Sequence, residues 1–216
     1  MKSSYNREGV DELTATNQVL SLEQIVRDFA DGMKAADAKR PVAQNARSAS
    51  KYRPGLGPFS EAATIRLVML ELVALQAEQY RDHSLEVAYP AVSRSKCDLC
   101  IGRAPHWNWA IEGKMLRLLG DNGLPNDNML MHILSPFPEH RSALTDCKKL
   151  RTSGLEGRKA VLIFGYECEA RPLELAIAAF EKLAGLQSSD RCIASAEGLV
   201  HPVHNRALVY GWDLDF

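Results

Sequence analysis

Apolar residues recur at helical spacing in two segments of the first 80 residues. Ser21 stands before the first segment, whose apolar positions would share one face: Leu22, Ile25, Val26 and Phe29. This pattern predicts a short helix. Ser60 is a good N-cap for the second, and apolar residues then follow at intervals of three and four, so we expect a helix from about 61 to 80.

The remainder of the chain alternates between strand-like and helix-like segments. Strand-like runs lie at 84–91, 96–102, 107–116 and 159–166, helical runs near 142–151 and 173–184, and one or two further strands at 199–214. A stretch rich in turn residues separates the third and fourth strands at 120–140. This order predicts an α/β fold in which helices flank a mixed central sheet of at least four strands.

The sequence also suggests where the main domain begins. Residues 31–58 are rich in Ala, Lys, Arg, Ser, Gly and Pro, and 52–58 (YRPGLGP) carries several turn signals. We therefore expect residues 1–58 to form an N-terminal arm with a short helix, and 59–216 to form the main α/β domain. The arm would serve docking or dimerisation, in a homodimer or a larger complex.

Composition narrows the class of protein without naming a function. The chain has 216 residues, 46% hydrophobic and 25% charged, which is enough apolar material for a buried core. No apolar run approaches the roughly 18 residues that span a bilayer, and the first residues lack an apolar signal segment. The five cysteines, an odd number, suit reduced thiols. We expect a cytoplasmic protein with no membrane partner.

Three polar residues stand out because they interrupt apolar strands. Asp98 lies within CDLCI, and Glu112 and Lys114 lie within WAIEGKML. Residues two apart on a strand share a face, so Glu112 and Lys114 would point the same way, roughly 6 to 7 Å apart. A hairpin would bring Asp98 to them. Paired carboxylates favour a cation between them, and hard oxygen ligands suit Mg²⁺ or Mn²⁺. An adjacent lysine stabilises charge that builds at a phosphorus centre.

An Asp in one strand followed by Glu-x-Lys in the next resembles the PD-(D/E)xK nuclease superfamily. The element order over about 59–185 is also similar to that family's restriction-endonuclease-like core. The resemblance implies a Mg²⁺-dependent nuclease in which Asp98 and Glu112 hold the metal, joined by the carbonyl of Gly113, while Lys114 positions the attacking water. Cys97 stands where the motif has proline, and Gly113 replaces the usual branched apolar residue.

Many members of that family add an acid from the first helix of the core, and two residues compete for this role. Glu61 lies in the first helical turn, where the helix dipole favours a carboxylate and where it could simply cap the helix. Glu71 interrupts an apolar run, where an unpaired carboxylate would be costly. We expect one of the two to face the Asp98 site.

Two functions of different classes follow from these residues. The first is metal-dependent hydrolysis of phosphodiester bonds in nucleic acid, in DNA rather than RNA, by a restriction-type or repair-type nuclease. The alternative is an inactive protein of nuclease fold that acts as a nucleic-acid-binding or regulatory subunit. The net charge of -1 does not mark a strongly basic nucleic-acid binder, but only the binding face needs to be positive. If the three polar residues have a structural role and not a catalytic one, Lys114 would form a buried or edge salt bridge with Asp98 or Glu112.

Other motifs carry weaker expectations. Cys97 and Cys100 have zinc-like spacing, but strand alternation would place them on opposite faces. His201 and His204 are expected at the surface or at a strand end, and Trp107 and Trp109 in the core. Three cations follow the site in the helix near 142–151 and could face phosphates: Lys148, Lys149 and Arg151.

Overall fold

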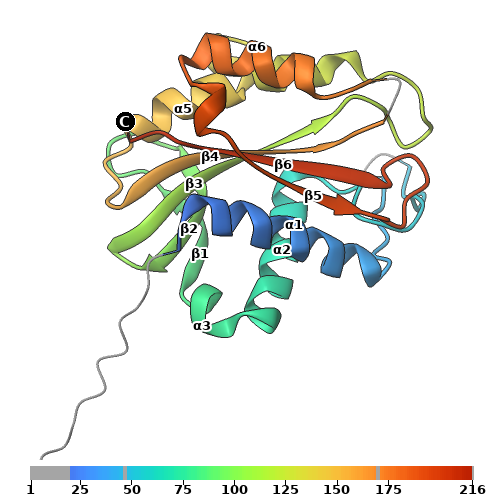
Figure 1. The fold of residues 1–216 in the computed structure, drawn as a ribbon, viewed down its shortest axis with the longest axis horizontal. Coiled ribbons are helices and arrows are strands. Elements are labelled where there is room, and N and C mark those ends of the chain that lie inside the picture. The colour runs from blue at the N-terminus through green and yellow to red at the C-terminus, as the bar shows by residue number, and fades with distance from the viewer. Residues whose placement is uncertain (1–19, 46–47, 169–170, 216) are drawn as a thin grey trace, which may run out of the picture.

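The computed structural model describes residues 20–45, 48–168 and 171–215, and its centre is one mixed sheet (Figure 1). Six strands make up this sheet, in the order β1-β2-β3-β4-β6-β5. Their bounds are β1 His83–Ala88, β2 Lys96–Arg103, β3 His106–Arg117, β4 Arg158–Tyr166, β5 Cys192–Glu197 and β6 Arg206–Asp213. The first four strands match the predicted runs, and the α/β prediction is confirmed.

Helices cover both faces of the sheet. α1 (Leu22–Ala38) and α2 (Glu61–Leu75) lie on one face, and α5 (Ala143–Arg151) and α6 (Glu174–Ala184) lie on the other (Figure 1). Each face has its own layer of buried apolar side chains. The shorter helical segments are α3 Ala77–Tyr80, α4 Met131–Leu134, η1 Asp127–Leu130, η2 Pro138–His140 and η3 Ser188–Asp190.

The strand directions explain the length of the connection between β3 and β4. β1, β2 and β3 form an antiparallel meander, whereas β3 and β4 are parallel. A parallel pair needs a crossover, and residues 118–157 supply it with α5 packed on the sheet. β6 runs antiparallel to β4, and β5 completes the sheet at its edge. The predicted segment 199–214 contains β6, but β5 lies before it and was missed.

Helix α1 is longer than predicted and belongs to the main core. Ser21 caps it by accepting a hydrogen bond from the Gln24 amide. Its buried side chains, including Phe29 and Met33, pack with α2, β5 and β6. The helix continues beyond the predicted apolar positions at 22–29, because Met33 and Ala36 extend the apolar face. Residue 58 therefore does not separate two hydrophobic cores. The predicted loose arm at 1–19 lies outside the described residues.

Helix α2 begins where the sequence predicts and ends earlier. The Ser60 hydroxyl accepts from the Ala63 amide at 3.4 Å. The helix stops at Leu75 because Gln76 leaves helical geometry, with φ of −141°, and α3 adds one further turn. In the part of the chain that the structure describes, no helix has the length and apolarity needed to cross a membrane.

Candidate active site

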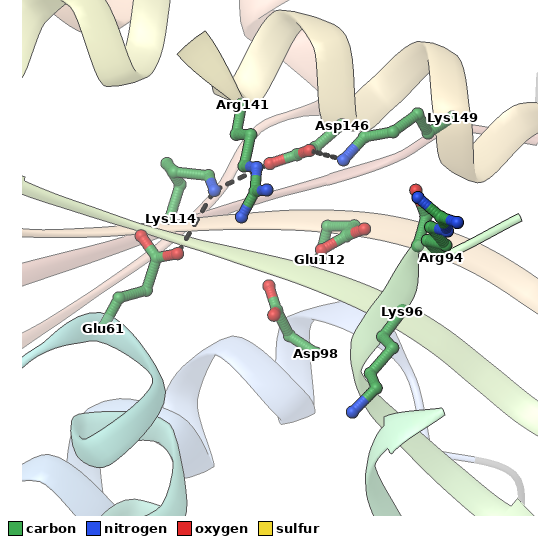
Figure 2. Close-up of a pocket in the computed structure, with 10 residues that line it drawn as sticks. Glu61, Arg94, Lys96, Asp98, Glu112, Lys114, Arg141, Asp146 and Lys149 are labelled. Carbon is green, nitrogen blue, oxygen red and sulfur yellow. Dashed lines mark hydrogen bonds and ion pairs between the residues drawn. The ribbon is translucent and has the colours of Figure 1, made fainter. Parts of the chain in front are cut away.

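A pocket of about 320 Å³ opens where β2 and β3 separate, between α2 on one face of the sheet and α5 on the other (Figure 2). It brings together four of the five predicted site side chains. The residues that line it are Glu61, Arg94, Ser95, Lys96, Asp98, Glu112, Lys114, Arg141, Asp146 and Lys149.

The pocket forms because β3 continues beyond the point at which its pairing with β2 ends. The last paired residues of β2 and β3 at this end are Leu99 and Ile111. Beyond them the amide of Gly113 donates to Asp98 Oδ2 at 2.9 Å, and the amide of Met115 donates to Glu61 Oε2 at 2.7 Å. Amides two residues apart point to the same edge of a strand. Two carboxylates thus take the places of the missing strand carbonyls, because buried amides need acceptors.

The regular alternation of β2 breaks at Asp98. Leu99 and Ile101 join the apolar layer beneath α1 and α2, whereas Cys97 and Cys100 both join the layer beneath α5 and α6. The prediction that the two cysteines lie on opposite faces is therefore wrong. Opposite Asp98 in β1, Glu86 has φ of 54°, so the β1–β2 pair is also distorted here. All five cysteines are free thiols.

Lys114 lies deep in the pocket between two carboxylates. Its ammonium nitrogen is 3.2 Å from Glu61 Oε1 and 2.7 Å from Asp146 Oδ2. The Lys114 side chain is 10% exposed and that of Asp146 is 3% exposed. Burial lowers the pKa of Lys114, but the charges of Glu61 and Asp146 outweigh it, so the pKa is raised above its ordinary value. Lys114 is a fixed cation at neutral pH and cannot serve as a general base.

Glu112 is the most enclosed carboxylate of the predicted set. Burial raises its pKa well above the ordinary value, and the neighbouring Asp98 adds to the effect through its charge and a hydrogen bond. Tyr89, which follows β1, donates its hydroxyl hydrogen bond to Glu112 Oε1. Burial and the charge of Glu112 raise the Tyr89 pKa, so this hydroxyl keeps its proton.

The structure distinguishes the two candidate helix acids. Glu61 lines the pocket, and burial raises its pKa while Lys114 opposes the shift. Glu71 lies ten residues further along α2, roughly 15 Å away along the helix axis. It forms an ion pair with Lys39 instead, outside the pocket. The expectation that one of the two faces Asp98 is met by Glu61, and Glu71 is removed from the candidate site.

The donor chemistry of the pocket fits a divalent cation. Asp98 and Glu112 are neighbouring carboxylates, and Gly113 of β3 lies beside the Asp98 oxygen. Among the described residues, no group of three or more His, Cys, Asp or Glu is arranged to hold a metal. Mg²⁺ commonly uses only one or two carboxylates and keeps several waters. Asp98 and Glu112, with the Gly113 carbonyl, would form such a site.

Cationic side chains surround the mouth of the pocket. Arg94 and Lys96 come from the β1–β2 connection and the start of β2. Arg141 precedes α5, and Lys149 lies in its last turn (Figure 2). Arg94, Lys96 and Arg141 are exposed. Acidic groups thus lie at depth and basic groups lie at the entrance, an arrangement suited to a ligand that carries negative charge.

The other sequence expectations have mixed outcomes. His201 and His204 were expected at the surface or at a strand end. They are buried, at 0% and 1% exposure, in the connection that precedes β6, so the surface alternative is wrong. His201 pairs with Asp121, and His204 contacts the Leu119 carbonyl. Trp107 and Trp109 lie in the core as predicted. Of the three α5 cations, Lys149 lines the pocket, whereas Lys148 and Arg151 are exposed and lie outside its lining.

Five residues that line the pocket were not identified from the sequence: Arg94, Ser95, Lys96, Arg141 and Asp146. Tyr89, which contacts Glu112, was also missed. Only Asp146 has a feature that is visible in the local sequence. It is an acid in the first turn of a helix capped by Ser142, yet it is buried where most capping acids are exposed.

No family model, curated protein or solved structure matches this chain.

Proposed function

We propose that this protein is a divalent-metal-dependent phosphodiesterase of the PD-(D/E)xK type that cleaves nucleic acid, with DNA favoured over RNA. The observation that carries the proposal is the convergence of Asp98, Glu112 and Lys114 on one pocket at the end of the β2–β3 ladder. The order α2-β1-β2-β3-α5-β4, with β3 and β4 parallel, supports the likeness to a restriction-endonuclease-like core.

The pocket's own residues divide the work of phosphodiester cleavage. Asp98 and Glu112 would hold Mg²⁺ or Mn²⁺, which when bound polarises a phosphoryl oxygen and lowers the pKa of a water. Lys114 stays protonated and would offer an N–H donor and a positive charge to the oxygens around phosphorus. Glu61 orients that ammonium while it also anchors α2 to the Met115 amide.

The cationic entrance supports an extended polyanion as substrate. Arg94 and Arg141 line the pocket from two different segments, so phosphates on either side of the scissile one would meet positive charge. The two lysines of the lining contribute less, because Lys96 lies near Glu86 and Lys149 pairs with Asp146. A chain of net charge -1 can therefore bind nucleic acid through this one face.

The second candidate is a nucleic-acid-binding or regulatory protein without catalysis. The hydrogen bond from Tyr89 to Glu112 favours it, because this hydroxyl occupies an oxygen of the expected metal ligand. The two candidates differ in metal dependence, since a binding protein would hold nucleic acid equally well with EDTA.

The deciding experiment measures cleavage of labelled single- and double-stranded DNA and RNA with Mg²⁺, Mn²⁺ or EDTA. Wild type should cleave only with metal. Asp98→Asn should lose metal binding in calorimetry as well as cleavage, whereas Lys114→Met should keep metal binding and lose about two to three powers of ten in rate. Glu71→Gln serves as control, because it removes an acid of α2 outside the pocket. Binding without cleavage under any metal would support the second candidate instead.

A further inference from the structure

Asp146 is a buried acid that the metal-holding and charge-stabilising roles above do not use. It lies in the first turn of α5 and is 2% exposed. An acid in a first turn usually interacts with the helix dipole at the surface. Burial of a charged pair costs more than an exposed pair because both ions lose water. Its buried position therefore calls for an explanation beyond capping.

The contacts of Asp146 link α5 to β3. One carboxylate oxygen is 2.7 Å from the Lys114 nitrogen, and the other pairs with Lys149 one turn further along α5. Lys114 Nζ is also 3.2 Å from Glu61, which comes from α2 on the opposite face of the sheet. The ammonium is thus held from both faces (Figure 2).

This arrangement leaves a defined direction for the remaining donor of Lys114. An ammonium has three N–H donors. Among the described residues, Glu61 and Asp146 accept two of them, so the third can point to a ligand in the pocket. A flexible four-carbon side chain would otherwise sample many rotamers, and misplacement by about 1 Å can cost on the order of a hundredfold in rate.

We infer that Asp146 is a positioning residue that fixes the Lys114 ammonium for transition-state stabilisation. The inference rests on the proposed function. Glu61 differs from Asp146 because it also accepts the Met115 amide and so supports the backbone. Among the described residues, the ion pairs of Asp146 reach β3 through the Lys114 side chain, and its charge also adds to the effect of burial in raising the pKa of Glu112. Saturating Mg²⁺ removes the influence through Glu112, so the remaining effect on cleavage should pass through Lys114.

A double-mutant cycle tests this inference in multiple-turnover assays with saturating Mg²⁺ and saturating labelled DNA. Asp146→Asn preserves the shape of the side chain and removes its charge. It should lower kcat about 10- to 100-fold, with Mg²⁺ binding retained in calorimetry. In the Lys114→Met background the same change should have no further effect, because the group through which it acts is gone. Glu71→Gln provides the matched loss of one acid and should retain wild-type kcat.

Each outcome of the cycle has a distinct meaning. If Asp146→Asn lowers kcat equally in both backgrounds, the residue acts independently of Lys114 and the inference is overturned while the proposed function stands. A wild-type kcat in Asp146→Asn also overturns it. If wild type cleaves nothing, the proposed function fails and the inference falls with it. Thermal unfolding of each variant checks the fold, and the Lys114→Met/Asp146→Asn protein supplies a neutral pair should the single change unfold the chain.

Discussion

The amide of Gly113 donates its hydrogen bond to the Asp98 carboxylate at 2.9 Å, beyond the last backbone pair between their strands. The carboxylate of a side chain therefore accepts the hydrogen bond that a backbone carbonyl of β2 would accept in a regular sheet. The replacement fixes one Asp98 oxygen against β3 and leaves the rest of the carboxylate at the pocket. This geometry depends on close packing around Gly113, and a first prediction follows from it.

Gly113→Ala should destabilise the protein, because the added Cβ would meet Ile65 Cδ1 at 2.7 Å. Overpacking of this kind costs about 1 to 3 kcal/mol in the free energy of unfolding. Ile65→Val removes the Cδ1 atom, so Gly113→Ala should cost clearly less in that background. Urea denaturation of the four proteins measures both effects. Equal costs in the two backgrounds would place the strain elsewhere in the backbone.

Glu112→Gln should stabilise the metal-free protein at pH 7. The fold raises the pKa of Glu112 above its ordinary value of 4.5, so ionisation at pH 7 works against folding, whereas below pH 4.5 both states are protonated and the effect vanishes. Glutamine carries no charge and still accepts the Tyr89 hydrogen bond. We therefore expect the free energy of unfolding of Glu112→Gln in EDTA to exceed that of wild type.

Saturating Mg²⁺ should make wild type more stable than Glu112→Gln, which reverses the order expected in EDTA. A cation that binds only the folded wild type adds to its free energy of unfolding, and the variant lacks the ligand. Urea denaturation at pH 7 with EDTA and with Mg²⁺ checks both halves of the prediction. A variant that is less stable than wild type in EDTA would indicate that Glu112 is compensated by a partner in the folded protein.

Arg94→Ala should weaken substrate binding rather than the chemical step. Arg94 is exposed and lines the pocket entrance, so its loss should raise KM roughly three- to tenfold and leave kcat near wild type. The slope of log affinity against log salt should fall by about 0.9 if one phosphate contact is lost. Lys182→Ala on α6 removes one exposed cation outside the pocket and should change neither quantity.

His204 should make stability fall as the pH falls through the weakly acidic range. Burial lowers its pKa from 6.5 to about 4. Between these values the unfolded chain binds a proton that the folded chain refuses, so the free energy of unfolding drops by up to about 3 kcal/mol as the pH falls from 6.5 to 4. Above pH 6.5 both states are neutral and the contribution is constant.

Replacement of His204 by Gln tests that linkage. Glutamine has no titrating ring, so the slope of unfolding free energy against pH between 4 and 6.5 should become shallower. His106→Gln removes a histidine whose side chain is 80% exposed, and it should leave the slope much closer to wild type. Equal slopes for wild type and His204→Gln would show that His204 titrates normally in the folded state.

Local patterns in the sequence were sufficient for most elements of the fold. The helix starts at Ser21 and Ser60 and the apolar run of β4 are properties of neighbouring residues, and each corresponds to an element in the structure. The apolar pattern identified only the first part of α1. Its place in the core follows from its packing on α2, β5 and β6.

The candidate site was harder to predict because part of it depends on contacts between distant elements. Asp98, Glu112 and Lys114 could be singled out as polar residues in apolar strands. To choose between Glu61 and Glu71, one must know where α2 packs against β3. To identify Asp146, one must know that the crossover brings α5 next to Lys114. Alternation failed at Cys97 because regular pairing with β3 has already ended at Leu99.

The packing of α1 on β5 and β6 also has a consequence for folding during synthesis on the ribosome. These strands emerge far later than the helix, and at about 5 to 20 residues per second the delay is roughly ten to thirty seconds. During that time α2, and later β4 through the contact of Phe164 with Phe29, can shield part of the α1 apolar face. The remainder is open to chaperones or to other nascent chains. Translation speed, rather than the intrinsic folding rate, then sets the earliest moment at which this layer of the core can close.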